Sequence, residues 1–158
     1  MNYISRRYTA RRSQSGVAAV EMAIILPVLI ILLAVPLFIG RVFWHYTVAQ
    51  KAAHDTARFL STMPPIEFRS PVRASSTVAV ARAIASAELA DLNPGLYPPD
   101  VTITCDGINC NGFTVPTSVT VTVQMPMFDP IFNGITYALV GDDGLLLTAA
   151  VTMRHVSN

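Results

Sequence analysis

The chain has 158 residues, of which 52% are hydrophobic and 13% charged, and its formal net charge is +1. This length accommodates one small domain, and the near-neutral charge argues against nucleic acid as a partner. The hydrophobic fraction is higher than a soluble domain of this size requires, which indicates a membrane segment.

Residues 1–16 form a polar, basic leader. It contains Arg6, Arg7, Arg11 and Arg12 and no acidic residue. The basic residues that follow the first apolar segment are sparser and are mixed with Asp55. Because basic flanks stay on the cytoplasmic side of a membrane, this asymmetry predicts an N-terminus in the cytoplasm and a C-terminal part outside.

The next segment is a helix that is long enough to cross a membrane. Residues 22–40 are an uncharged run of 19 residues, and about 20 apolar helical residues cross a hydrocarbon core of roughly 30 Å. A cleaved secretory signal is the alternative, but its apolar stretch is usually only about 7 to 15 residues. Pro27 and Pro36 are tolerated in a membrane helix. We expect a single-pass membrane protein with its transmembrane segment at 17–40.

Beyond the bilayer we expect the helix to continue as a stalk over residues 41–62, which Met63-Pro64-Pro65 ends. Trp44, His45 and Tyr46 stand where amphipathic rings settle at the membrane interface. Small or apolar residues at spacings of three and four predict one continuous helical face, made of Val42, Tyr46, Ala49, Ala53, Thr56 and Leu60.

Residues 63–158 are expected to form the exported α+β domain. A connecting loop over 66–74 precedes a second helix from about Ser76 to Asp91, which Ser75 or Ser76 can cap. Alternating apolar and polar residues predict strands over 101–104, 119–125 and 147–154, the last preceded by a turn at 141–144. The predicted fold is therefore a pilin-like α+β architecture: a long N-terminal helix, a second helix and a three-stranded antiparallel sheet.

Two cysteines lie in the exported part, where thiols oxidise. Cys105 and Cys110 enclose a turn-forming sequence, and a disulfide there closes a six-residue loop worth about 2 kcal/mol. A zinc site is the alternative, but His45, His54 and His155 are scattered along the chain without metal-ligand spacing. We expect a structural disulfide and no metal.

No catalytic signature is found in the sequence. It contains no G-x-S-x-G motif and no Walker-type phosphate loop. Asp106, Asn109 and Asn111 miss the spacing of a calcium loop, so turn chemistry explains them better. We expect neither an enzyme nor a cofactor.

The boundary between leader and helix is the most informative stretch. Gly16 closes the leader, Val17 follows it, and Glu21 is the only charge between Arg12 and Arg41. A charged residue in a membrane helix costs a few kcal/mol at the bilayer centre and less near the interface, so a compensating partner is expected. The alternative is that Glu21 lies at headgroup depth and has no role.

A short basic leader, a glycine and a glutamate five residues later resemble the type IV prepilin class. Within that class the chain is most similar to the TadE-like proteins, the minor pilins or pseudopilins of tight-adherence (Flp) pilus systems. The resemblance is carried by GVAAVEMAIILPVLIILL at 16–33 and AQKAA at 49–53. It is also carried by VTVTVQMPMFDPIF and LLLTAAVTMRH in the tail.

The resemblance implies that a prepilin peptidase cuts between Gly16 and Val17, so that Glu21 becomes the fifth residue of the mature chain. Ser13 to Gly16 are then expected to form an extended approach to the scissile bond. Glu21 is expected to pair with the α-amine of a neighbouring subunit. Because major Flp pilins are very short and this exported part has roughly a hundred residues, the resemblance favours the minor class.

The resemblance also implies partners and a place. The partners are the lipid bilayer, the prepilin peptidase, other pilin or pseudopilin subunits and the pilus assembly machinery, and the process is pilus assembly for cell adhesion. The place is the bacterial cytoplasmic (inner) membrane, with the C-terminal domain on the periplasmic or extracellular side. The alternative function is an uncleaved, membrane-anchored binding module exported from the cell.

Overall fold

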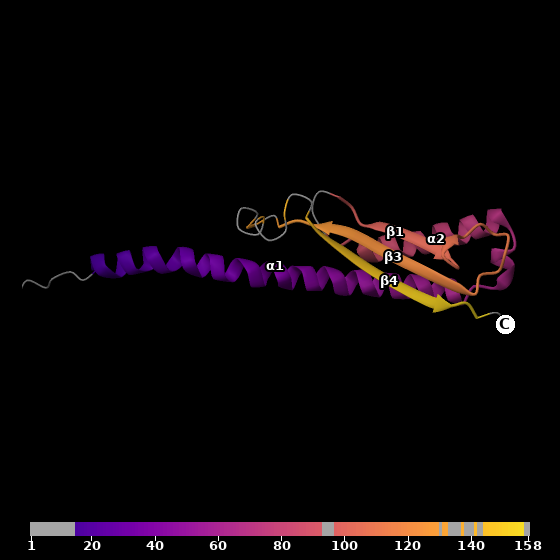
Figure 1. Ribbon diagram of the computed structural model, residues 1–158, viewed down its shortest axis with the longest axis horizontal. Coiled ribbons are helices and arrows are strands. Elements are labelled where there is room, and N and C mark those ends of the chain that lie inside the picture. The colour runs from indigo at the N-terminus through magenta and orange to yellow at the C-terminus, as the bar shows by residue number, and fades with distance from the viewer. Residues whose placement is uncertain are drawn as a thin grey trace, which may run out of the picture.

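A computed structural model describes residues 15–92, 97–129, 131–132, 137, 141 and 144–156. Figure 1 shows helix α1 running the length of the molecule, with the other elements gathered along its C-terminal half. In chain order the elements are α1 (Ser15–Ser61), the 3-10 helix η1 (Pro65–Phe68), α2 (Pro71–Leu89), β1 (Asp100–Cys105), β2 (Ile108–Asn109), β3 (Ser118–Met127) and β4 (Leu145–Arg154). The predicted α+β class, with a long N-terminal helix, a second helix and an antiparallel sheet, is confirmed.

The sheet in the described part of the chain has four strands in the order β2-β1-β3-β4, all antiparallel to their neighbours. The prediction of three strands was therefore wrong. The missed strand, β2, has two residues and pairs only with the end of β1, where Cys105 lies opposite Ile108. A strand of two residues shows no alternation of apolar and polar side chains, so periodicity cannot reveal it.

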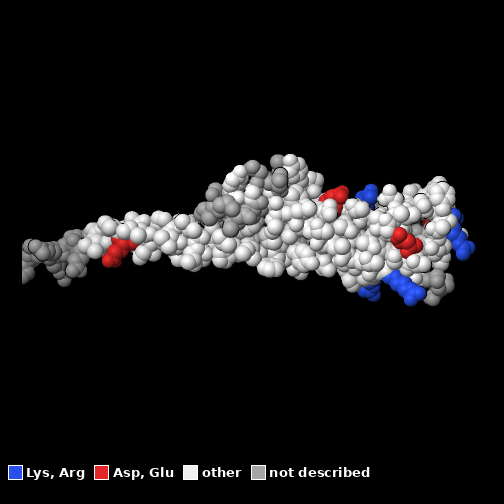
Figure 2. Space-filling view, in the orientation of Figure 1, with Lys and Arg blue, Asp and Glu red and all other residues white. Residues whose placement is uncertain are grey.

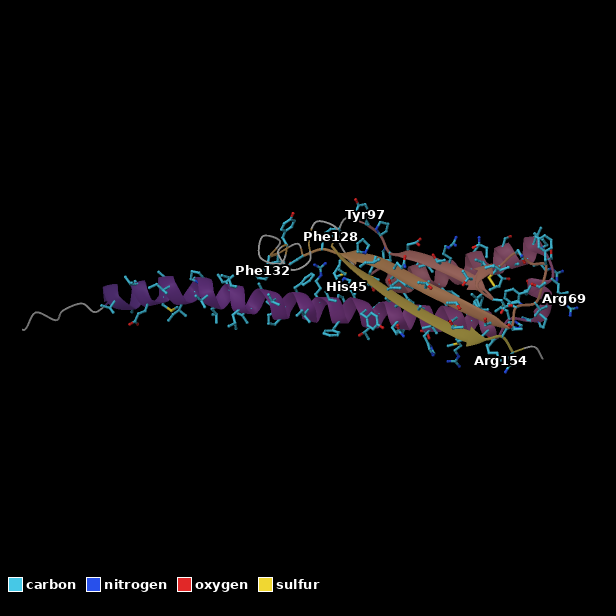
Figure 3. All side chains as sticks on the ribbon, viewed as in Figure 1. His45, Arg69, Tyr97, Phe128, Phe132 and Arg154 are labelled. Atoms are coloured by element: carbon cyan, nitrogen blue, oxygen red, sulfur yellow. A yellow bond between two sulfur atoms is a disulfide. The ribbon has the colours of Figure 1, made fainter. Side chains whose placement is uncertain are left out.

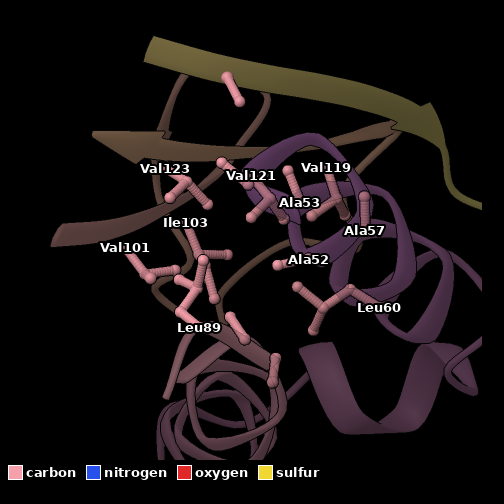
Figure 4. Close-up of a cluster of buried hydrophobic side chains, with 14 of the residues drawn as sticks. Ala52, Ala53, Ala57, Leu60, Leu89, Val101, Ile103, Val119, Val121 and Val123 are labelled. Carbon is pink, nitrogen blue, oxygen red and sulfur yellow. The ribbon is translucent and has the colours of Figure 1, made fainter. Parts of the chain in front are cut away.

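The core lies between the sheet, the C-terminal half of α1, and α2. The alternation predicted for β3 is confirmed, because Val119, Val121, Val123 and Met125 are all 0% exposed. Small side chains on α1 let the helix backbone approach the sheet closely (Figure 4). The buried core residues of α1 are Ala49, Ala52, Ala53, Ala57 and Leu60.

The face of α1 predicted from spacing was partly wrong at its start. Tyr46 is exposed, and the buried face passes instead through His45 and Ala49. Adjacent residues of a helix differ by about 100° in direction. A face that contains His45, Ala49 and Thr56 therefore turns Tyr46 away from the sheet.

Helix α2 begins earlier than predicted. Its N-cap is Ser70 and its first residue is Pro71, so the expected loop over 66–74 contains η1 and the first turn of α2. Proline suits the first helical position because the missing N–H would have no partner there. Ser75 and Ser76 lie inside the helix and do not cap it, since their hydroxyls donate to carbonyls three residues earlier.

The disulfide between Cys105 and Cys110 is present, as predicted. Asp106 follows it in a left-handed conformation with φ of 50°. Its carboxylate accepts hydrogen bonds from the hydroxyl of Thr117 at 2.6 Å and from the backbone N–H groups of Thr117 and Ser118 at 2.9 and 2.8 Å. These bonds, first of all those from Thr117, lower the pKa of Asp106 to about 2. The carboxylate therefore joins the β1–β2 turn to the start of β3.

We expect Asp106→Asn to destabilise the domain at neutral pH by an amount that vanishes in acid. The folded-state pKa of about 2 lies below the ordinary 3.8, so the stabilising contribution is present above about pH 4. It is lost as the pH falls through 2. Urea unfolding of the detergent-solubilised protein between neutral pH and pH 2 measures the difference. Asp91→Asn, which removes an exposed carboxylate at the end of α2, is the control. A pH-independent difference for Asp106→Asn would contradict the expectation.

Candidate functional site

The N-terminal half of α1 stands apart from the folded domain. Every described residue from Gly16 to Leu33 is exposed, including the large apolar side chains. This helix is long and apolar enough to cross a membrane, and only 11% of its most apolar window is buried inside the structure. An apolar core helix of a soluble domain would instead be covered, so the exposed half of α1 requires another apolar environment.

The predicted processing residues lie in the first turns of this exposed helix. Gly16 and Val17 are both helical, and a Cβ atom added to Gly16 would meet nothing within 4 Å. Packing against the described part of the chain therefore gives no reason for a glycine here. Ser15 and Gly16 belong to the helix in the free chain, so the extended approach expected at the peptidase requires the helix to open there, whereas Ser13 and Gln14 lie outside the described residues.

Glu21 is the only Asp, Glu, Lys or Arg between residues 16 and 40, and Figure 2 shows one acidic patch on the otherwise uncharged N-terminal half of α1. In the described part of the chain Glu21 forms no salt bridge or hydrogen bond. The next basic side chain along α1, Arg41, is 20 residues away, about 30 Å at the helical rise. A partner for Glu21 must therefore come from outside the folded domain.

The backbone position of Val17 is one turn before Glu21 on the same face of α1. If the chain is cut after Gly16, the new α-amine and the carboxylate lie at the same end of the helix. The first four N–H groups of a helix have no intrahelical partner, so this end also carries a partial positive charge. The first turns of α1 can thus offer one cation and one anion to another helix.

The block at residues 49–53, which carries part of the resemblance, has a different role. Ala49, Ala52 and Ala53 are buried in the hydrophobic core that α1 shares with the sheet and α2. Lys51 points the other way and binds Glu88 of α2 at 2.9 Å and Asp55 at 3.3 Å. The hydrogen bond with Glu88 contributes most to the raised pKa of Lys51, and Lys51 lowers the pKa of Asp55. This block holds the domain on α1.

Of the three rings predicted for the membrane interface, two are exposed and one is buried. Trp44 and Tyr46 are exposed, but His45 is buried, with 1% of its surface exposed. The Nδ1 atom of His45 lies 2.9 Å from the carbonyl oxygen of Arg41. His45 therefore faces the domain and cannot face lipid.

The other histidines lie far from His45 and from each other. His54 is exposed and lies 3.6 Å from Asp55. His155 is buried beside Phe68, with its Nε2 atom 2.9 Å from the carbonyl oxygen of Met63. Within the described ranges no group of three or more His, Cys, Asp or Glu side chains gathers as a metal site requires.

Sequence reasoning missed the contact between α1 and the end of β3. Arg41 donates from Nη1 to the carbonyl oxygen of Phe128 at 3.3 Å, across 87 residues of sequence. Asp129 then accepts the backbone N–H groups of Ile131 and Phe132 on Oδ1, at 2.9 and 3.1 Å. The sequence feature that could have indicated this contact is the pair of apolar dipeptides, Met127-Phe128 and Ile131-Phe132, on either side of Asp129.

Residues 16–58 match the family model described as TadE-like protein. The chain carries a TadE-like N-terminal segment. The resemblance predicted from the sequence is thereby confirmed over this segment, which contains the exposed half of α1 and most of its packed half. Comparison with curated proteins and with solved structures found no match. The TadE-like segment indicates a role in tight-adherence pilus systems.

Proposed function

We propose that this protein is a minor pilin or pseudopilin that supports assembly of a tight-adherence pilus. A prepilin peptidase removes residues 1–16, and the mature chain stays in the bacterial inner membrane with its domain outside. The observation that carries the proposal is the exposed half of α1, whose single charge, Glu21, has no partner in the described part of the chain. The proposed role is structural and uses no catalytic group, metal or cofactor.

The charge on Glu21 supports this role because apolar helices pack against one another with little selectivity. Two opposite unit charges about 4 Å apart attract by roughly 4 kcal/mol at an effective dielectric constant near 20, before desolvation is subtracted. Desolvation offsets much of that attraction. A contribution of one or two kcal/mol is enough to select one register between helices that are otherwise interchangeable.

The competing function is an uncleaved, membrane-anchored binding module. A groove at the far end of the domain favours it. The groove has a volume of about 480 Å³ and lies between η1, residues 115–117 just before β3, and the end of β4, with Arg69 and Arg154 in its lining. Figure 3 shows both arginines at the end of the molecule opposite the exposed helix. This groove can serve a partner whether or not the leader is removed, so processing decides between the two functions.

The test is the mass of the protein purified from cells that contain the matching prepilin peptidase. The pilin function requires a mature chain that begins at Val17. We expect Gly16→Leu to retain residues 1–16, with processing reduced roughly tenfold or more, because a bulky side chain blocks a site shaped for a small one.

Gly40→Leu is the matched control, since a Cβ atom at Gly40 also meets nothing within 4 Å. It adds the same side chain to the same helix and is expected to be processed normally. An intact leader on the wild-type protein would exclude the pilin function and favour the binding module.

A further inference from the structure

Two residues inside the apolar run of α1 are covered by the chain itself. Ala34 is 0% exposed and Phe38 is 6% exposed, whereas every described residue from Gly16 to Leu33 is exposed. Ala18, Ala19 and Ala23 show that an alanine of this helix is accessible when nothing lies over it. Part of the exported domain therefore lies against the outer end of the membrane-crossing stretch.

A described segment beside this stretch is the turn after β3, made of Phe128, Asp129, Ile131 and Phe132 and called the Asp129 turn below. The Arg41 contact holds the carbonyl group of Phe128 level with the end of the apolar run. Figure 3 shows Phe132 beside α1 on the N-terminal side of His45, farther along the exposed helix than Phe128. The turn thus runs from the membrane boundary toward the bilayer.

The depth of the turn follows from the helical rise. Phe38 and Ala34 precede Gly40, the last residue of the apolar run, by two and six residues. At 1.5 Å per residue they lie about 3 and 9 Å inside that boundary. A bilayer that covers residues 22–40 therefore includes the level of these two residues, and Figure 3 places Phe132 toward that level, on the N-terminal side of His45.

The Asp129 turn has the exposed apolar side chains and the satisfied backbone groups that contact with the outer part of a bilayer requires. Ile131 is 75% exposed, and Phe132 is half-buried beside it. The backbone N–H groups of both residues are satisfied by Asp129, and the carbonyl of Phe128 by Arg41. Backbone groups that enter hydrocarbon must be satisfied within the protein. Exposed Phe43 and Trp44 continue the apolar surface on α1 at the same boundary.

We propose that the Asp129 turn enters the outer leaflet of the bilayer, as a second membrane contact beside α1. The partner is lipid, because the exposed side of the turn is continuous with the lipid-facing surface of the helix. The contact fixes the domain against the membrane surface. The inference rests on α1 crossing the membrane, and it is independent of leader removal.

The test uses the full chain in phosphatidylcholine vesicles with an environment-sensitive fluorophore on one introduced cysteine. Both native cysteines are in the disulfide, so they do not take the label. The probe is Ile131→Cys. Ile31→Cys marks the middle of the crossing stretch, and Ile66→Cys, at a 50% exposed isoleucine in η1, marks the far end of the domain.

We expect nitroxide lipids to quench the label at residue 131, and iodide in the water to quench it about threefold less than at residue 66. Equal quenching by iodide at 131 and 66, with residue 31 protected, overturns the contact while leaving the membrane helix intact. Exposure of residue 31 to iodide overturns the membrane crossing and the contact together. Shielding of residue 131 from both quenchers, increasing with protein density, would assign the turn to a second protein and overturn the lipid contact.

Discussion

Glu21→Ala is expected to leave membrane insertion and leader removal intact and to reduce co-purification with other pilin subunits about tenfold or more. The carboxylate is exposed and forms no contact in the described part of the chain, so its loss does not affect the fold. The expected effect is on assembly alone. If desolvation leaves one to two kcal/mol of the roughly 4 kcal/mol attraction, the change corresponds to about tenfold in affinity.

Glu67→Ala is the matched control, because it removes a carboxylate from η1 at the opposite end of the molecule. Glu21→Gln separates charge from size and is expected to behave like Glu21→Ala. Quantitative recovery of partner subunits on affinity-purified protein measures all three variants. Normal recovery with Glu21→Ala would remove the pairing role from Glu21.

The α-amine of a cut chain lies one turn from the Glu21 carboxylate of the same helix, so pairing within one subunit must be distinguished from pairing between two. An internal pair stabilises the helix end of each separate molecule. Glu21→Ala would then leave the α-amine of each separate subunit unpaired and destabilise the isolated subunit, because an unpaired charge in a membrane helix costs up to a few kcal/mol. A variant whose isolated subunit is as stable as the wild type but does not assemble therefore indicates a pair between subunits.

The parts of the fold that the sequence predicted are those with a long, regular pattern. The apolar run in α1 is long enough to indicate only a helix, and the strict alternation in β3 is long enough to indicate only a strand. The two-residue strand β2 is too short for a period. The start of α2 was misplaced because Ser75 and Ser76 resemble caps, whereas Pro71 begins the helix.

Some residues of the candidate site were also predicted from the sequence and others were not, but the reason differs from that for the fold. Gly16 and Glu21 were found in the sequence because they interrupt a pattern, and no contact among the described residues explains either of them. The Asp129 turn was missed because its anchor, the contact of Arg41 with Phe128, joins residues 87 positions apart. Only the folded chain brings that turn beside α1 at Arg41.

Gly112→Ala is expected to destabilise the folded domain by about 3 kcal/mol or more, the largest loss of stability that we predict for a single methyl group. Gly112 has φ of 74°, which L-residues rarely adopt. A Cβ atom there would lie 2.5 Å from the carbonyl carbon and oxygen of Ser70 and 2.6 Å from the nitrogen of Pro71. These are backbone atoms at the start of α2, so no side chain can rotate to relieve the clash.

Gly107→Ala separates the clash from the backbone conformation. Gly107 has φ of 83°, but its added Cβ atom would meet nothing within 4 Å, so strain alone is expected to cost about 1 kcal/mol. Thermal unfolding of both variants in detergent is the measurement. For a domain of this size the difference of about 2 kcal/mol corresponds to roughly 10 °C. Equal losses would show that the loop after the disulfide moves away from α2 without cost, and that the close approach at Ser70 contributes nothing to the stability of the domain.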